Sequence, residues 1–247
     1  MSQKTNPNTY RYGINKNWVS RWTASNGKEL AKMSVEDRKI RNYLLKKYHD
    51  ALIDKIEIER KTSLNSFDKS IKPEIFIFIR CVNVGIISVD QEKLNEAILF
   101  INKVVGREYS VKINPLVFLN QFWSARIIAR KIADDIENRI PFRVAQKNMI
   151  TQVMKSKILG IKTKLSGRLN GVDMARCEGY SEGLVPISTI RCDLDYALEE
   201  AHTVKGVIGV KVWLNRGQIL DKGLDKQNYP TIKPTIEKRG EKGGHHE

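Results

Sequence analysis

The sequence of 247 residues contains only three cysteines, Cys81, Cys177 and Cys192, and none of them form a Cys-x-x-Cys motif. An odd number of widely spaced cysteines suits a reducing cytoplasm better than a disulfide scaffold. The four histidines also lack the spacing of a metal site. We therefore expect neither a metal ion nor any other cofactor.

Long apolar segments are missing as well. No stretch reaches the ~20 apolar residues that a membrane-spanning helix needs. The N-terminus, Met-Ser-Gln-Lys-Thr-Asn-Pro, is polar and has no signal-peptide core. These absences predict a cytoplasmic protein with no membrane partner.

Acidic residues are scarce relative to basic ones. The chain has 43 Lys and Arg against 28 Asp and Glu, which gives a formal net charge of +15. Because like charges oppose compaction, an excess of this size indicates a polyanionic partner, and nucleic acid is the first candidate. The 41% hydrophobic content still suffices for a buried core.

The basic excess is concentrated in one segment, since residues 138–172 contain no acid at all. A solvated helix normally mixes charges of both signs. Helical spacing places Arg143, Lys147 and Lys155 on one stripe, and strand alternation places Lys162 and Lys164 on one face. We expect the stripe and the strand face to form one continuous positive surface. The cations of this segment are Arg139, Arg143, Lys147, Lys155, Lys157, Lys162, Lys164 and Arg168.

Hydrophobic periodicity predicts an α+β fold. An irregular segment, 1–35, is held by Trp18 and Trp22, and Ser34 can cap the first helix. The expected helices are 36–50, 90–106, 119–139, 141–157 and 196–203. The expected strands are 55–60, 74–80, 108–113, 160–166, 187–195 and 206–214, with a loop at 61–73.

Pro115 and the change to long helices predict a domain boundary near 115–120. We divide the chain into an N-terminal extension (1–38), a first domain (39–118), a second domain (119–215) and a flexible tail (216–247).

Catalytic constellations are not evident. Asp193 and Asp195 share a face of a strand and could do acid–base or metal work, but no third ligand accompanies them. Partnership with Arg191 or with lysines explains them better. His202, beside two glutamates, is more often a structural histidine, and Trp213 is more often a core residue. We therefore expect no enzyme activity.

Several long motifs resemble bacterial small-subunit ribosomal protein three. The opening Gln3-Lys4-x-Asn6-Pro7, followed by Arg11-x-Gly13-Ile14, resembles the start of that family. The block Ser166-Gly-Arg-Leu-Asn-Gly-Val-Asp-Met-Ala-Arg176 resembles a motif of its second half. Further matches are Glu182-Gly-Leu-Val-Pro186, Arg191-x-Asp-Leu-Asp-Tyr196 and the run from Glu200 to Trp213.

The resemblance implies that the first domain is a type II KH fold, which clamps single-stranded nucleic acid with a Gly-x-x-Gly loop. The corresponding residues here are Gly85, Ile86, Ile87 and Ser88. The loop lacks the family's two basic residues and its second glycine. Because this removes local charge, we expect the clamp to be degenerate.

The resemblance also implies binding to small-subunit ribosomal RNA and to messenger RNA. The helix near 142–157 would line the channel through which the message enters and would assist its unwinding; Arg143 and Lys147 match the family's basic positions, whereas Val144 does not. Gly167 and Gly171 would let Arg168 and Arg176 reach phosphates, and the N-terminal segment with Lys4, Arg11 and Lys16 would order on ribosomal RNA.

The implied protein neighbours are small-subunit proteins two, four, five, ten and fourteen. Two alternatives stay open, a free-standing RNA-binding regulator or chaperone and a DNA-repair lyase.

Overall fold

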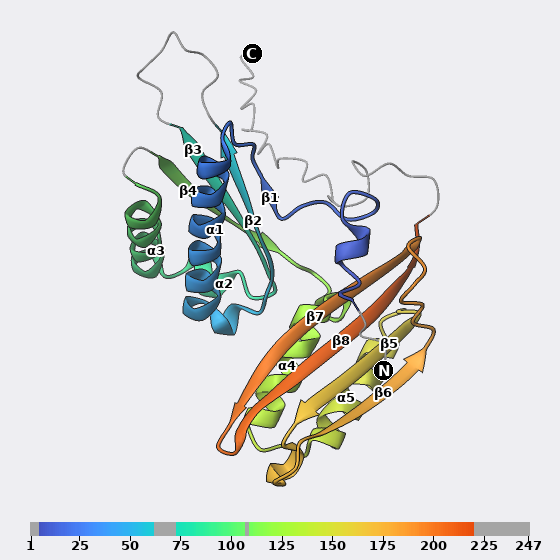
Figure 1. The fold of residues 1–247 in the computed structure, drawn as a ribbon. Helices are drawn as coiled ribbons and strands as arrows, with labels where there is room; N and C mark the ends of the chain where they lie inside the picture. The colour runs from blue at the N-terminus through green and yellow to red at the C-terminus, as the bar shows by residue number, and fades with distance from the viewer. Residues whose placement is uncertain (1–4, 62–72, 107–108, 220–247) are drawn as a thin grey trace, which may run out of the picture.

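Two four-stranded sheets, each covered by helices on one face, form the part of the chain that the structure describes (Figure 1). The structure is a computed structural model that describes residues 5–61, 73–106 and 109–219. The strand order is β1-β2-β3-β4 in the first sheet and β6-β5-β8-β7 in the second. This architecture confirms the expected α+β class.

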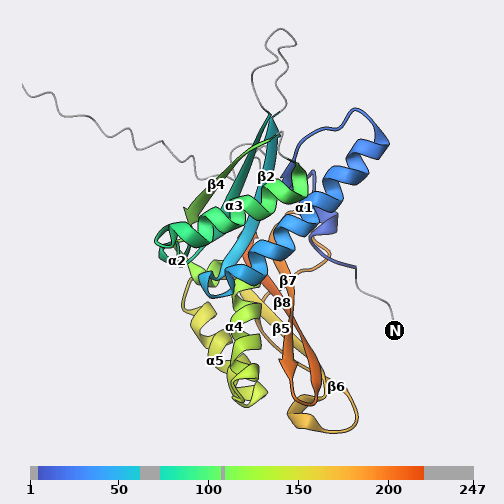
Figure 2. The same ribbon diagram turned by 90° about the vertical axis from the view of Figure 1, so that its left-hand side faces the viewer.

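The first sheet is mixed: β2 and β3 pair antiparallel, whereas β1 with β2 and β3 with β4 pair parallel. Helices α1 and α3 lie side by side on one face (Figure 2) and cover the alternating Ile75, Ile77 and Ile79 of β3, which are fully buried. The elements of this first unit are η1 (Thr9–Arg11), β1 (Ser20–Arg21), α1 (Gly27–Lys47), η2 (His49–Ala51), β2 (Ile53–Lys61), β3 (Glu74–Cys81), α2 (Gly85–Ser88), α3 (Gln91–Val105) and β4 (Ser110–Val117).

Helix α1 begins nine residues before the predicted start at residue 36. The carboxylate of Glu29 accepts hydrogen bonds from the amide and the hydroxyl of Ser25, which fixes the first turn there. Ser34 therefore lies within the helix and does not cap it. Strands 55–60 and 74–80 and helix 90–106 are confirmed. Most of the predicted loop 61–73 lies outside the described residues.

Strand β4 is longer than the predicted 108–113 and continues through Pro115. Proline cannot donate a hydrogen bond to a neighbouring strand. It is tolerated here because β4 is an edge strand, paired only with β3.

The second sheet is antiparallel throughout, and α4 and α5 cover its rear face as seen in Figure 1. Its core joins residues of both helices to the inward positions of β5 and β8, such as Leu165 and Val212. The elements of this second unit are η3 (Gln121–Trp123), α4 (Ala125–Glu137), α5 (Phe142–Met154), β5 (Gly160–Gly167), η4 (Leu169–Gly171), β6 (Arg176–Gly183), β7 (Cys192–Thr203) and β8 (Gly206–Gln218).

Two predicted helices of this unit differ from the structure, the predicted strand 187–195 begins only at Cys192 of β7, and one strand was missed. The predicted helix 196–203 is part of strand β7, because pairing with β8 from Tyr196↔Trp213 to Thr203↔Gly206 overrides the helix preference of Ala-Leu-Glu-Glu-Ala. The predicted helix 119–139 is broken before α4, where the Ser124 side chain accepts a hydrogen bond from the Ile127 amide. The edge strand β6 was not predicted, since its residues have low β-propensity.

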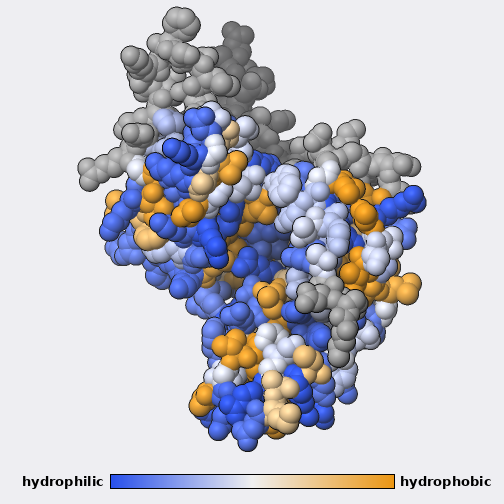
Figure 3. Space-filling view, viewed as in Figure 1, coloured by the Kyte–Doolittle hydropathy of each residue, from blue (hydrophilic) through white to orange (hydrophobic). Residues whose placement is uncertain are grey.

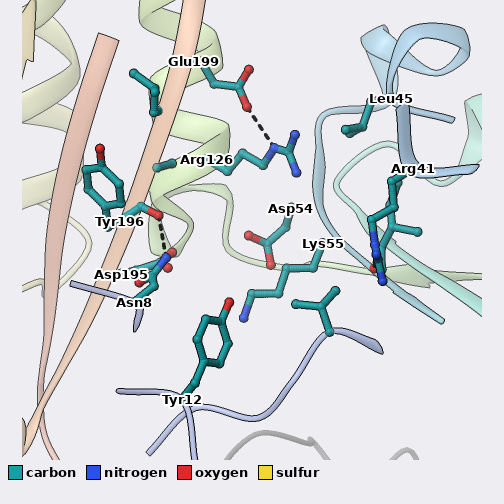
Figure 4. A pocket seen from close by; sticks show the side chains of 14 residues that line it. Asn8, Tyr12, Arg41, Leu45, Asp54, Lys55, Arg126, Asp195, Tyr196 and Glu199 are labelled. Carbon is teal, nitrogen blue, oxygen red and sulfur yellow. Dashed lines mark hydrogen bonds and ion pairs between the residues drawn. The ribbon is translucent and has the colours of Figure 1, made fainter. Parts of the chain in front are cut away.

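The two units meet at a polar junction that encloses a cavity of about 420 Å³ (Figure 4). Asp54 and Lys55 of β2 face Asp195 of β7 across it. The hydroxyl of Ser124, which caps α4, donates to the Asp54 carboxylate, and both residues are buried. One side chain therefore caps a helix of the second unit and binds a strand of the first.

Ser124→Ala should lower the free energy of unfolding by about 1–3 kcal/mol, because it removes a helix cap and leaves a buried carboxylate without its donor. Thermal or urea denaturation of the full chain measures this loss. Thr151→Ala, at an exposed position of α5, is the control and should change stability little. Equal stabilities for the two variants would contradict the proposed role of Ser124.

Candidate nucleic-acid interface

Helix α5 presents a basic stripe to solvent. Arg143, Lys147 and Thr151 are exposed on its outer side, and Lys155 follows as the C-cap residue. The opposite side, as expected, is buried against the second sheet and consists of Phe142, Ala145, Gln146, Met149, Ile150 and Val153.

Two side chains of this stripe contact residues of the edge strand β6. The guanidinium of Arg143 donates to Glu178 at 2.7 Å, and this hydrogen bond raises the pKa of Arg143. The ammonium of Lys147 lies 5.6 Å from the centre of the Tyr180 ring. Within the described residues Lys147 and Lys155 have no ion-pair partner, so their charges are available to an external anion.

Lys162 and Lys164 of β5 lie on the other side of the second sheet. The side chains between and beside them, Ile161, Thr163 and Leu165, are buried on the helix-covered face. The Thr163 hydroxyl donates to Gln146 of α5 at 2.8 Å. The expectation of one continuous positive surface is therefore wrong, because the sheet itself separates the α5 stripe from the β5 lysines.

A third lysine joins the β5 pair on this outer face. Lys211 of β8 stands directly opposite Lys164, and Trp213 stands opposite Lys162. These residues line a cavity of about 870 Å³ together with Tyr196 of β7. We call this cavity the lysine groove. Lys211 is not among the predicted site residues, although its position between Val210 and Val212 in a predicted strand already placed it on the outer face.

The lysine groove lies on the face of the second sheet opposite α4 and α5, and this face of the sheet is turned toward the viewer in Figure 1. The space-filling view of the same side shows mainly hydrophilic residues with hydrophobic ones in separate groups (Figure 3). Of the residues that the structure describes, none of those that line the groove is acidic. Its surface is thus suited to a negatively charged ligand.

Arg11 does not face solvent. Its side chain is 0% exposed and donates to the carbonyl oxygens of Pro7, Ile187, Thr189 and Cys192 at 2.8–3.1 Å. Burial lowers its pKa, an effect that nearby Asp193 partly offsets. Because its guanidinium donates to these buried carbonyls, the expectation that Arg11 binds RNA is wrong.

Lys16 is also buried and forms an ion pair with Asp195 at 3.3 Å. The same carboxylate accepts from the Arg216 guanidinium at 2.8 Å and from the Ala125 amide at 3.0 Å. Burial alone would raise the pKa of Asp195, but Arg216, Lys16 and Lys55 together hold it well below its ordinary value. Asp193 lies 3.7 Å from Arg216. Both aspartates are thus paired with cations, Asp195 with Lys16 and Arg216 and Asp193 with Arg216. The expected lysine partner is confirmed for Asp195, whereas the ion pairs of the described residues do not include Arg191.

The remaining predicted cations have different surroundings. Arg168 donates to the Val172 carbonyl and to Asp173 in its own loop and to the Lys205 carbonyl in the turn between β7 and β8. Arg139, between α4 and α5, and Arg176, at the start of β6, are exposed. Lys4 lies outside the described residues.

The predicted KH loop forms the one-turn helix α2. Ile87 is fully buried in the first core, whereas Ile86 and Ser88 are exposed. Neither Gly85 nor Ser88 has a positive φ, so the backbone here does not require glycine. The segment offers no cationic side chain to a phosphate.

The described part of the chain contains no group of three or more His, Cys, Asp or Glu residues that could hold a metal ion. In residues 5–61, 73–106 and 109–219, no helix combines the length and apolarity needed to cross a bilayer.

The chain is similar in sequence to known ribosomal proteins. A family model described as "Ribosomal protein S3, C-terminal domain" matches residues 132–214. Three similar curated proteins, each 45% identical, are named small ribosomal subunit protein uS3. They come from Ureaplasma parvum (91% of this chain and 84% of the relative), Mycoplasmoides gallisepticum (95% and 86%) and Spiroplasma citri (97% and 90%).

Arg11→Lys should destabilise the protein by about 2–3 kcal/mol, because an ammonium cannot reach the four carbonyls that the guanidinium fork satisfies. Urea denaturation of the full chain measures the effect. Arg38→Lys, at an exposed position of α1, is the matched control. Similar midpoints for the two variants would show that Arg11 does not secure the N-terminal segment.

Asp195 should make stability depend on pH. Because its pKa is lower in the folded than in the unfolded state, its contribution is complete above ~pH 4 and is lost as the pH falls toward the folded-state pKa. Asp195→Asn should cost about 3 kcal/mol near neutral pH, and its difference from the parent protein should shrink below ~pH 4.

Urea titrations at several pH values test this dependence. Asp173→Asn, whose side chain is fully exposed, should follow the parent curve. A constant difference between Asp195→Asn and the parent protein across the acidic range would contradict the assignment.

Proposed function

The chain belongs to the family of small ribosomal subunit protein uS3, and from this premise we propose that it binds ribosomal RNA and borders the path of messenger RNA in the subunit. Members of this family are structural proteins of the ribosome rather than enzymes, which sets the DNA-repair lyase aside. The protein is accordingly a structural constituent of the small ribosomal subunit.

The observation that carries the RNA-binding proposal is the exposed basic stripe of α5. Arg143, Lys147 and Lys155 succeed one another along a surface with no acid on its own helix. Their spacing, at ~6 Å per four residues, approaches the distance between neighbouring phosphates of a single strand. Each phosphate that a cation neutralises releases condensed counterions, which drives binding.

Unwinding of the messenger RNA requires no catalytic group. Cations that hold a single strand make its re-pairing less favourable, while translocation supplies the free energy. The Arg143 end of its ion pair with Glu178 is exposed, so water screens and weakens the pair. A phosphate can replace the glutamate as the partner of Arg143 at little cost.

The other RNA contacts that we propose involve Arg139, Arg176 and the lysine groove, together with Lys4. The α2 turn contributes at most backbone amides, because it has no cation. We also propose that the protein neighbours are small-subunit proteins two, four, five, ten and fourteen, as the resemblance implies.

The double variant Arg143→Ala, Lys147→Ala should slow translation through a stable hairpin placed where the message enters, by roughly twofold or more, because it removes two phosphate contacts. Ribosomes that contain the variant, compared on structured and unstructured messages, provide the measurement.

Lys32→Ala, Lys39→Ala removes the same charge from exposed positions of α1 and serves as the control. Unchanged hairpin rates in ribosomes that have incorporated the α5 variant would refute the message-binding role. If the parent protein did not sediment with small subunits in moderate salt, the free-standing regulator would be the better assignment.

A further inference from the structure

The N-terminal segment binds both units of the molecule. Residues 8–16 contact the second unit and residues 19–22 contact the first, so the segment spans the junction (Figure 1). We call residues 8–22 the N-terminal strap. We propose that the strap locks the angle between the two units, which would otherwise rotate about their second connection, residues 118–124. This inference goes beyond the proposed function, because it concerns the free protein and does not depend on RNA.

The second-unit end of the strap is held by polar contacts. Three of its side chains, those of Arg11, Asn15 and Lys16, are buried there. Arg11 donates to three carbonyl oxygens of residues 187–192, and Asn15 donates to a further carbonyl of the same segment at 2.8 Å. Lys16 forms its ion pair with Asp195 at 3.3 Å. Because buried donors that lose their acceptors destabilise a protein, this end of the strap stays attached.

The first-unit end of the strap extends the first sheet. Ser20 and Arg21 form β1, which pairs parallel with β2. The Ser20 hydroxyl and the Trp22 indole both donate to the Asp37 carboxylate of α1 at 2.8 Å. Arg21 forms an ion pair with Glu59 of β2 at 3.0 Å. This end is therefore bound both to the sheet and to the helix that covers it.

The strap has almost no slack between its two ends. Lys16 is its last ion-pair anchor on the second unit. On the first unit the Val19 carbonyl already accepts a hydrogen bond from the Ile58 amide at 3.1 Å. Three residue steps of extended chain span at most ~11 Å. A rotation of the units that moves these two anchors farther apart must therefore break one of them.

The rest of the junction offers little resistance to rotation. The hydrophobic cores of the two units have no residue in common. Cavities of about 420 and 220 Å³ lie between the units and are lined by residues of both. Interfaces between domains that are polar and loosely packed permit relative motion.

The direct contacts between the units do not replace the strap. The Ser124–Asp54 hydrogen bond lies within the connection 118–124 itself, so it holds the pivot and leaves the angle free. The His49 ring approaches Asp134 of α4 only to 3.9 Å, at a partly exposed position.

Two crossings between the units fix an angle that one crossing leaves free. In Figure 1 the strap (dark blue) and the connection 118–124 (green) pass between the units as separate segments. Because the strap reaches both sets of partners in one arrangement of the units, its binding free energy favours that arrangement over the others. The angle therefore depends on the length of the strap as well as on its contacts.

The test lengthens the strap and keeps the contacts at both of its ends. Eight Gly and Ser residues are inserted between Trp18 and Val19 of the full chain, which adds ~15 Å of reach. The control carries the same insertion between Val204 and Lys205, in the exposed turn that joins β7 to β8 within the second unit.

The distance between the units is measured by single-molecule energy transfer between two fluorescent dyes. One dye is attached to Cys177, which is exposed on β6, and the other to Lys39→Cys, at an exposed position of α1. The other two cysteines, Cys81 and Cys192, are buried and therefore shielded from the dyes.

The parent protein and the control should each give one narrow distance distribution. The longer strap should widen this distribution by about twofold or more, because the added reach lets the units rotate without breaking an anchor. Equal widths for the strap insertion and the control would overturn the proposal.

Hydrogen exchange at the amides of Ile77 and Val212, one in each core, shows whether both units stay folded. Both amides should exchange equally slowly in the parent protein and in the two variants. Faster exchange at either amide in the strap variant alone would also overturn the proposal, since the strap would then be part of the fold of that unit and not a lock between two intact units.

Discussion

The buried carboxylate of Asp195 is the interaction on which the arrangement of the molecule depends. It receives Lys16 from the N-terminal segment, Arg216 from β8 and the first amide of α4, and it faces Lys55 of the first unit. A charge removed from water is stable only when it is paired and hydrogen-bonded. Four parts of the chain that are distant in sequence are thereby held at one point, close to the Ser124–Asp54 contact that joins the two units.

Because some cations are paired inside the protein, the net charge overstates how many cations are available to RNA. A basic excess suggests an RNA-binding surface, yet Arg11, Lys16, Arg60 and Arg216 are used to build the protein. Arg60, for example, lies between Glu36 and Asp37 of α1 at 2.8 and 2.6 Å. The cations that we propose for RNA lie on the outer side of α5 and in the lysine groove, and of these Arg143 pairs with Glu178. The N-terminal segment is docked on the second unit by its own cations, Arg11 and Lys16.

Much of the fold was predictable because the relevant patterns are local. Alternation identified β2, β3, β5 and the inner part of β8, and the helical period separated the exposed Arg143 and Lys147 from the buried Met149 and Val153. The failures share a cause. Residues 196–203 have helix-forming side chains but lie opposite β8, and β6 is a weak strand that exists only because β5 offers an edge. Pairing between distant segments outweighs local preference wherever that preference is small.

The sequence by itself determined the family, the α+β class, the acid-free segment and the side of each helix or strand on which its cations lie. Only the tertiary structure decided which cations reach solvent and which surfaces they share. The alternation of the strand predicts that Lys162 and Lys164 point away from Leu165. It does not predict which face of the sheet the helices cover, and it does not predict that Lys211 lies beside the two lysines. Those outcomes depend on the packing of α5 and on the register of β5 with β8, which are contacts between residues far apart in the chain. For the same reason Arg11 could not be recognised as an internal residue, because its four acceptors become a site only when the segment 187–192 folds around it.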